Sequence, residues 1–173
     1  MILIELKTSC KRILIGCGYR APNAAADEVR RFLENFQTLL NNIYTDKPES
    51  LIILGDFNDK CITWDSKHEK SELGNKFHDL VTGNNLFQII DELTHITETS
   101  AYLIDLIITD SPAYMIDSGT CAPLGDPYHC CIYCKFQIQT VRKKNYTRHI
   151  WKYDDCNFET LNEAIRTAPW RSQ

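Results

Sequence analysis

The sequence predicts a mixed α/β fold, in which strands and helices alternate along part of the chain and some neighbouring strands form hairpins. Two aliphatic runs, residues 51–54 and residues 103–108 with one aspartate among them, are typical of strands buried on both faces. Apolar residues recur at the helical period over residues 24–44, which predicts an amphipathic helix before the first of these strands. Together these patterns favour a sandwich of sheets and helices.

Local signals place the individual elements. The expected strands are residues 2–6 and 13–18, which form a hairpin, followed by 51–54, 86–90, 103–108 and 129–138. The expected helices are residues 24–44, a shorter one built on Leu73, Phe77, Leu80 and Val81, and a short one built on Phe158, Leu161 and Ile165. Gly83 is placed to end the second helix, and a Pro- and Gly-rich stretch at residues 118–127 precedes the last strand.

The chain changes character near Thr140, where we expect a domain boundary. Residues 1–140 contain the alternating strands and helices and form the predicted globular domain. Residues 141–173 begin with a basic and aromatic segment and continue into the short helix. We expect this second part to be a linker, although a basic and aromatic segment also suits nucleic-acid binding.

The composition fits a globular protein and limits its partners. Of the 173 residues 43% are hydrophobic, which suffices for a core, and the formal net charge is −4. This charge argues against a protein that coats nucleic acid, but not against an enzyme that meets phosphate through a divalent cation held by carboxylates. We expect an intracellular protein with no membrane span, because the N-terminus lacks a basic leader and no apolar run is long enough.

The chain contains eight cysteines. Cys131 and Cys134 form a CxxC pair, but residues three apart on a strand face opposite sides, so this pair is poorly suited to share a metal ion. We therefore expect reduced thiols rather than disulfides or a zinc site.

Gly55, Asp56, Phe57 and Asn58 follow the first aliphatic run directly. Residues two apart on an extended strand place their side chains on the same side, so Asp56 and Asn58 arrive together at the end of a buried strand. This geometry is that of a catalytic rim. An ordinary loop after a strand is the alternative interpretation, since Gly, Asp and Asn are common in turns.

Asp105 lies within the second aliphatic run, where burial of an unpaired charge costs several kcal/mol. It therefore needs a partner or a place at the end of the sheet. A buried aspartate is suited to orient an imidazole, and His129, at the start of the last predicted strand, is the best-placed histidine. The alternative is a structural role, in which Asp105 caps a neighbouring loop.

Tyr19 and Arg20 end the second predicted strand at a turn that contains Pro22 and Asn23. The phenol is able to donate a hydrogen bond to a phosphate oxygen, and the guanidinium is able to pair with phosphate charge. Packing at the rim of the sheet is the alternative for both residues.

These features occur in one order: a strand ending in Tyr-Arg-x-Pro, one ending in Gly-Asp-Phe-Asn, one containing Ile-Asp-Leu-Ile, and a histidine that opens a last strand. This order resembles the endonuclease/exonuclease/phosphatase superfamily, which has the DNase I fold, and most of all the endonuclease domain of non-LTR retrotransposons. Residues 148–153, with Phe158 and Leu161, resemble the segment that follows that domain before the reverse transcriptase. The resemblance implies a partial four-layer α/β sandwich of two packed mixed sheets flanked by helices, with residues 1–140 as the C-terminal portion of the domain.

The resemblance also assigns roles to single residues. Asp56 would act as the base or orienter for the attacking water, and Asn58 would hydrogen-bond the scissile phosphate. Tyr19 would contact the same phosphate. Asp105 would orient His129, which meets a phosphate oxygen.

The same resemblance implies a substrate and a cofactor. Arg20 would bind the substrate beside Asn58, and a magnesium ion would neutralise the charge on the leaving oxygen. The reaction would be hydrolysis of a phosphodiester that nicks one strand of DNA in the nucleus. The N-terminal half of the domain or a reverse transcriptase domain of the parent polyprotein would be the protein partner.

Two departures from the family pattern lower the activity that we expect. Tyr128 stands where the family has an aspartate, and Asp126, two residues earlier, is the candidate to replace it as a metal ligand. The early asparagine and the principal metal-binding glutamate of the family lie before the part that this chain resembles. We therefore expect poor metal affinity and little or no nuclease activity. A non-catalytic remnant that binds nucleic acid or protein, and a phosphatase of the same superfamily, are the alternatives.

Overall fold

The computed structural model describes residues 1–8, 11–46, 48–60, 64, 72–137 and 153–168. The chain forms two compact units, Met1–Val141 and Arg142–Gln173, and every predicted site residue belongs to the first. The described part of the second unit contains a 3-10 turn at Tyr153–Asp155 and the helix α3 (Phe158–Thr167). Most of the predicted basic and aromatic segment lies outside the described residues.

A mixed sheet of five strands forms the centre of the first unit. Its strands, in spatial order, are β1 (Ile2–Lys7), β2 (Arg12–Tyr19), β3 (Ser50–Asp56), β7 (Asp105–Thr109) and β4 (Phe87–Gln88). β1 and β2 form the predicted antiparallel hairpin, and β2 pairs with β3 in parallel. β7 runs antiparallel to both of its neighbours. The carboxyl ends of β2 and β3 therefore lie beside the amino end of β7.

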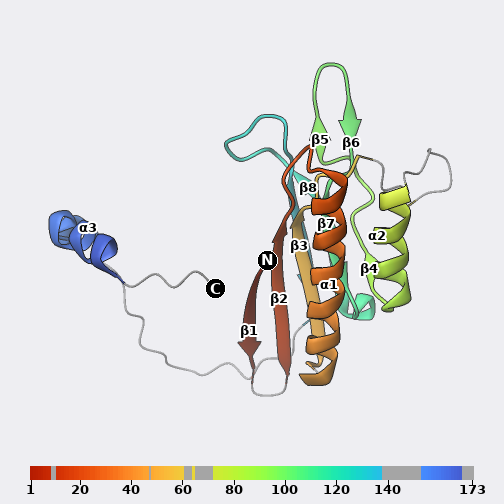
Figure 1. Ribbon diagram of the computed structural model, residues 1–173, viewed down its shortest axis with the longest axis horizontal. Helices are drawn as coiled ribbons and strands as arrows, with labels where there is room; N and C mark the ends of the chain where they lie inside the picture. Colours follow the sequence, from red (N-terminus) through yellow and green to blue (C-terminus); the bar gives the residue numbers. More distant parts are fainter. Residues whose placement is uncertain (9–10, 47, 61–63, 65–71, 138–152, 169–173) are drawn as a thin grey trace. The chain divides into compact units, whose positions relative to one another are not determined.

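Two helices, α1 (Ala26–Asp46) and α2 (Glu72–Gly83), cover one face of this sheet (Figure 1). The apolar residues of α1 recur every three or four positions, so one side of the helix faces the sheet. The buried residues on this side of the sheet are Leu33, Phe36, Leu40, Ile43, Leu51, Ile53, Phe57, Phe77, Val81, Leu86, Leu106 and Ile108. No helix in the described residues is long and apolar enough to cross a membrane.

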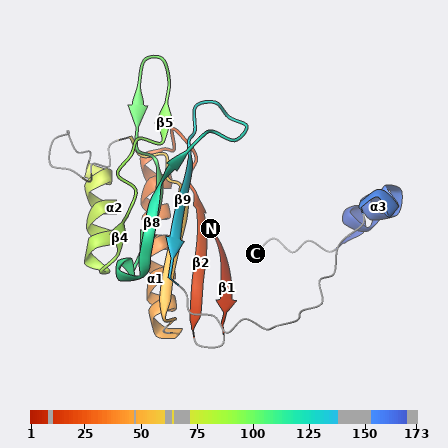
Figure 2. The same ribbon diagram turned by 180° about the vertical axis from the view of Figure 1, so that it is seen from behind.

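The other face of the central sheet packs against a two-stranded sheet of β8 (Met115–Cys121) and β9 (Cys131–Phe136), seen in Figure 2. Ile13, Ile52, Ile90 and Ile107 are buried on this side, with Ile132, Cys134 and Phe136 packed against them. β3 is thus buried on both faces, as its aliphatic run predicts. The prediction of a mixed α/β fold with packed sheets and flanking helices is confirmed.

Local details differ from the sequence prediction at three places. β4 has two residues instead of the five expected at 86–90. The Ile89 N–H still donates to Ile107 of β7, but the Ile90 N–H and carbonyl bond to the Gln88 side-chain amide instead of to a strand. β8 extends into the Pro- and Gly-rich stretch at residues 118–127, where the sequence predicts no strand. Its pairing with β9 stabilises the strand there. A short hairpin of β5 (His95–Ile96) and β6 (Ala101–Tyr102) was not expected.

Candidate functional site

Three strands bring the predicted site residues to one end of the central sheet. Tyr19, the last residue of β2, pairs in register with Asp56, the last residue of β3. Asp56 in turn pairs with Asp105, the first residue of β7. Asp105 therefore lies at the end of the sheet and not within it, where its carboxylate can find a polar partner.

Gly55 allows β3 to approach β2 closely just before Asp56. Its φ is +149°, a conformation that residues with a side chain rarely adopt. A Cβ atom at this position would lie 1.8 Å from the carbonyl oxygen of Gly18, which is its register partner on β2. The glycine before Asp56 is therefore a requirement of the backbone, and it fixes where the following carboxylate lies.

Asn58 directs its amide at the Asp56 carboxylate. Its backbone has a φ of +49°, in the left-handed region that asparagine tolerates better than most residues. The Asn58 backbone N–H donates to Asp56 Oδ1 over 3.0 Å, and its side-chain Nδ2 donates to Asp56 Oδ2 over 2.6 Å. Both carboxylate oxygens are thus hydrogen-bonded by the same residue. Phe57, between them, points the other way and is buried among the aromatic rings under α1 and α2.

Asp105 and His129 form the predicted pair. Nδ1 of His129 lies 3.1 Å from Oδ2 of Asp105, and the two side chains are 29% and 13% exposed. With Nδ1 donating to the carboxylate, Nε2 of the ring is available to a substrate or a metal ion. His129 precedes β9 and forms an isolated bridge with His95 of β5. The β5–β6 hairpin and the last strand therefore both hold His129 in place.

Asp56, Asp105 and His129 come together as one group. One ligand atom from each lies within 4.8 Å of the others. Burial raises the pKa of the Asp56 carboxyl and the neighbouring Asp105 raises it further, while the Asn58 hydrogen bonds and His129 act in the opposite direction. Two carboxylates and an imidazole at this spacing fit a divalent cation, because carboxylate oxygens neutralise its charge and imidazole completes its coordination.

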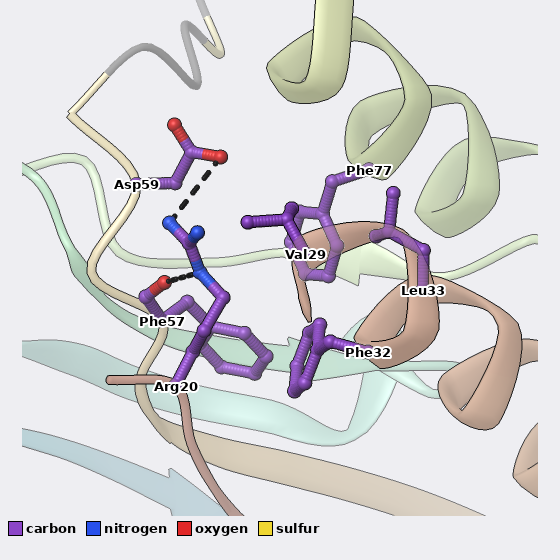
Figure 3. Close-up of a pocket in the computed structure, with 7 residues that line it drawn as sticks. All are labelled: Arg20, Val29, Phe32, Leu33, Phe57, Asp59 and Phe77. Carbon is purple, nitrogen blue, oxygen red and sulfur yellow. Dashed lines mark hydrogen bonds and ion pairs between the residues drawn. The ribbon is translucent and has the colours of Figure 1, made fainter. Parts of the chain in front are cut away.

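The remaining predicted residues, Tyr19, Arg20 and Asp126, have other surroundings. Tyr19 is exposed at the end of β2. Arg20 directs its guanidinium to the backbone carbonyl of Phe57 and to Asp59 (Figure 3). Asp126 is exposed and accepts a hydrogen bond from the Tyr128 N–H over 2.9 Å. Among the described residues Asp126 is not part of the group formed by the two aspartates and the histidine.

Two residues beside the group have no signal in the sequence. The His95 ring meets the His129 ring edge to face, with centroids 4.7 Å apart, and within the described part of the chain its buried Nδ1 has no hydrogen-bond partner. Thr94 is fully buried, and its hydroxyl accepts the backbone N–H groups of Ile104 and Asp105. Neither residue stands in a periodic or motif position, so only the folded chain reveals them.

Comparison with known proteins identifies the family of the chain. Residues 13–129 match the model of the family described as endonuclease-reverse transcriptase, which covers more than half of the chain. No curated protein matches the sequence.

Solved structures share the fold at low sequence identity. The endonuclease domain of TRAS1, a telomere-specific non-LTR retrotransposon, aligns with a TM-score of 0.64 and 17% identity, over 80% of this chain and 64% of that one. The 3′-5′ exonuclease NExo from Neisseria meningitidis aligns with a TM-score of 0.57 and 17% identity, over 79% and 65%. An endonuclease/exonuclease/phosphatase family protein from Leptotrichia buccalis gives a TM-score of 0.51 at 17% identity, over 79% and 52%.

The chain thus spans less than two thirds of the length of each of these structures. Its match to the family model nevertheless includes Tyr19, Asp56, Asn58, Asp105 and His129. The chain belongs to the endonuclease-reverse transcriptase family, within the endonuclease/exonuclease/phosphatase superfamily that has the DNase I fold.

Proposed function

We propose that this chain is a metal-dependent phosphodiesterase domain of a non-LTR retroelement and that it nicks DNA. The observation that carries the proposal is the group of Asp56, Asp105 and His129, with ligand atoms within 4.8 Å of one another at one end of the sheet. The family description and the TRAS1 endonuclease domain support the choice of reaction and substrate.

The chain's own residues divide the work of hydrolysis. Asp56 accepts a proton from the attacking water or orients it, a task suited to a carboxylate whose pKa is raised by burial and by Asp105. The Asn58 amide, now bonded to Asp56, is close enough to donate to a phosphate oxygen when substrate displaces that contact. Tyr19 is exposed, and its hydroxyl donates to the same phosphate.

The histidine has a separate task in the proposed reaction. Asp105 holds His129 through Nδ1, which leaves Nε2 available to a substrate oxygen and favours one tautomer of the ring. Asp56 and Asp105 are the carboxylates that would hold Mg²⁺, and a bound ion supplies charge neutralisation for the leaving oxygen. Asp126 would join them only if the turn that ends at Tyr128 rearranged.

We propose that turnover by this chain alone is slow. In the described residues the group contains two carboxylates and no glutamate, and Tyr128 is the residue directly before His129. Fewer anionic ligands lower the affinity for Mg²⁺, because this ion gives up its water reluctantly.

A plasmid-nicking assay tests the function. Supercoiled DNA is incubated with excess purified chain and Mg²⁺, and the nicked circle is quantified for wild type, Asp56→Asn and Asp27→Asn. Asp27 is the matched control, because its side chain lies on α1 and is 78% exposed. We expect slow nicking that a chelator stops, that Asp56→Asn reduces by about 100-fold or more, and that Asp27→Asn leaves unchanged.

Two outcomes overturn the proposal. Nicking that survives in Asp56→Asn belongs to another nuclease in the preparation. A folded wild-type chain that retards the plasmid on a gel without cutting it would instead be a non-catalytic remnant that binds nucleic acid.

A further inference from the structure

Arg20 is engaged with the segment that carries the predicted catalytic residues. Its Nε donates to the carbonyl of Phe57 over 2.5 Å, and its Nη2 donates to the carbonyl of Asn58 over 2.6 Å. Nη2 also lies 3.5 Å from Oδ2 of Asp59. Three consecutive residues after β3 are therefore held by one guanidinium group. Figure 3 shows two of these contacts, those with Phe57 and Asp59.

The backbone of Arg20 is tied to the same segment. The Arg20 N–H donates to the carbonyl of Asp56 over 3.0 Å, and the Arg20 carbonyl accepts Nδ2 of Asn58 over 2.9 Å. Nδ2 of Asn58 thus bridges the Arg20 carbonyl and the Asp56 carboxylate. Arg20 meets every residue from Asp56 to Asp59, through its backbone or its side chain.

This arrangement explains how Asn58 keeps an uncommon backbone conformation. A residue other than glycine at a φ of +49° persists only where the surrounding structure over-determines it. The two carbonyls that Arg20 holds belong to Asn58 and to the residue before it, so they flank the Asn58 φ angle on both sides. The planar guanidinium group can donate to two acceptors at once in a fixed geometry. The ammonium group of lysine also donates, but without a fixed geometry.

The guanidinium of Arg20 is also largely buried, which leaves little access for a substrate phosphate. Arg20 and Asp59 have side chains that are each only 12% exposed. Figure 3 shows the Arg20 side chain beside a small pocket lined by Val29, Phe32, Leu33, Phe57 and Phe77, on the side of the sheet covered by the helices. Asp56 lies on the strand position whose side chain alternates away from that of Phe57.

We propose that Arg20 is a positioning residue, which holds the segment from Phe57 to Asp59 so that the Asn58 amide meets Asp56, and that it does not bind phosphate. This role differs from the substrate-binding role that the family resemblance implies for Arg20. Its effect on the rate rests on the proposed nuclease function, but its effect on the Asn58 conformation does not.

The discriminating variant is Arg20→Lys, with Arg30→Lys as the matched control. Lysine keeps the positive charge beside Asp59 and can still meet a phosphate as a point charge, but it loses the fork that holds two carbonyls. Arg30 is on the surface of α1, paired with Asp27. Circular dichroism and thermal melting establish that each variant is folded, and Arg20→Gln, which retains one amide donor for a carbonyl, serves as a second variant should Arg20→Lys fail to fold.

The first readout needs no catalysis. Backbone hydrogen exchange at Asn58, whose N–H is bonded to Asp56 Oδ1, is compared by NMR in wild type, Arg20→Lys and Arg30→Lys. We expect exchange in Arg20→Lys to be about tenfold faster or more, the effect of weakening one buried hydrogen bond, and Arg30→Lys to match wild type. Exchange at Asn58 that is unchanged in Arg20→Lys or Arg20→Gln overturns the positioning role, whether or not the chain cuts DNA.

The second readout separates positioning from phosphate binding. In the nicking assay we expect Arg20→Lys to lower kcat by about 10- to 100-fold with little change in KM, because misplaced groups lose rate rather than ground-state affinity. We expect the slope of log affinity for a DNA duplex against log salt to be the same in Arg20→Gln as in wild type. A salt slope reduced by about one, or a raised KM with unchanged kcat, shows that Arg20 binds phosphate and overturns the proposal.

Discussion

Nδ1 of His129 lies 3.1 Å from Oδ2 of Asp105, although Asp105 begins β7, His129 lies just before β9, and the two stand 24 positions apart in the sequence. The Thr94 hydroxyl accepts the N–H of Asp105, and His95 packs against the His129 ring. Residues of the β5–β6 hairpin region therefore contact both partners of the pair. The residues that support the pair can be tested one at a time.

Replacing Asp105 by asparagine should cost activity without loss of fold. The side chain keeps its shape, but its amide no longer stabilises the charged imidazole or selects the tautomer with hydrogen on Nδ1. We expect the nicking rate to fall by about 100-fold or more. Asp79→Asn, at an exposed position of α2, is the control. An Asp105→Asn chain that nicks at the wild-type rate would mean that His129 does not depend on this contact.

His95 should support His129 through its shape and not through its nitrogen atoms. Phenylalanine preserves an aromatic ring for the edge-to-face contact and removes the buried Nδ1 that has no partner in the described structure. We expect His95→Phe to nick at nearly the wild-type rate and to melt at an equal or higher temperature. His95→Ala should nick about tenfold more slowly, since the His129 ring loses its neighbour. Equal losses in both variants would instead assign a chemical role to the His95 imidazole.

The raised pKa of Asp56 should make stability depend on pH in a defined direction. Burial and the charge of Asp105 raise this pKa in the folded chain, so between the ordinary aspartate value and the raised value the folded state binds more protons than the unfolded state. The contribution of Asp56 to the free energy of unfolding therefore falls as pH rises through this interval. Asp56→Asn removes the titration.

Thermal melts with a chelator present measure this effect. We expect the melting temperature of Asp56→Asn to rise relative to that of wild type as pH increases from the ordinary aspartate pKa towards neutrality. The same variant is the inactive one in the nicking assay, so the site would gain stability as it loses function. A difference in melting temperature that does not vary with pH would contradict the raised pKa.

Gly55→Ala should destabilise the chain far more than Gly83→Ala. A Cβ at Gly55 would collide with the backbone of Gly18 and would force alanine to a φ of +149°, whereas a Cβ at Gly83 has no atom within 4 Å. We expect Gly55→Ala to cost about 3 kcal/mol or more and Gly83→Ala to change stability by less than about 1 kcal/mol. Urea denaturation of both variants provides the comparison, and similar midpoints would show that β2 and β3 separate easily at this end.

The sequence was most informative where a residue's environment is set by its neighbours in the chain. The aliphatic runs predict β3 and β7, the helical period predicts α1, and the spacing of Asp56 and Asn58 predicts that they act together. The position of His129 at the start of the last predicted strand makes it the expected partner of Asp105, and the family resemblance adds its role at a phosphate oxygen.

Other features depend on contacts that no local pattern records. β8 is half-polar and is ordered by its pairing with β9, so the sequence shows only the loop residues that follow it. The position of His95 beside His129 arises from a bridge between two segments. The contacts of Arg20 with the Phe57 and Asn58 carbonyls exist only once β2 and β3 lie side by side.

Phe57 has a consequence for how this site can fail. Phe57 is 2% exposed, and its ring packs against Phe32 and Phe36 of α1 and Phe77 of α2, while the residues on either side of it are the proposed catalytic residues. A smaller side chain in either helix would let this ring shift, and the shift would move Asp56 and Asn58 as well. The proposed activity can therefore be lost through mutations in the helices, even where Asp56, Asn58, Asp105 and His129 are all unchanged.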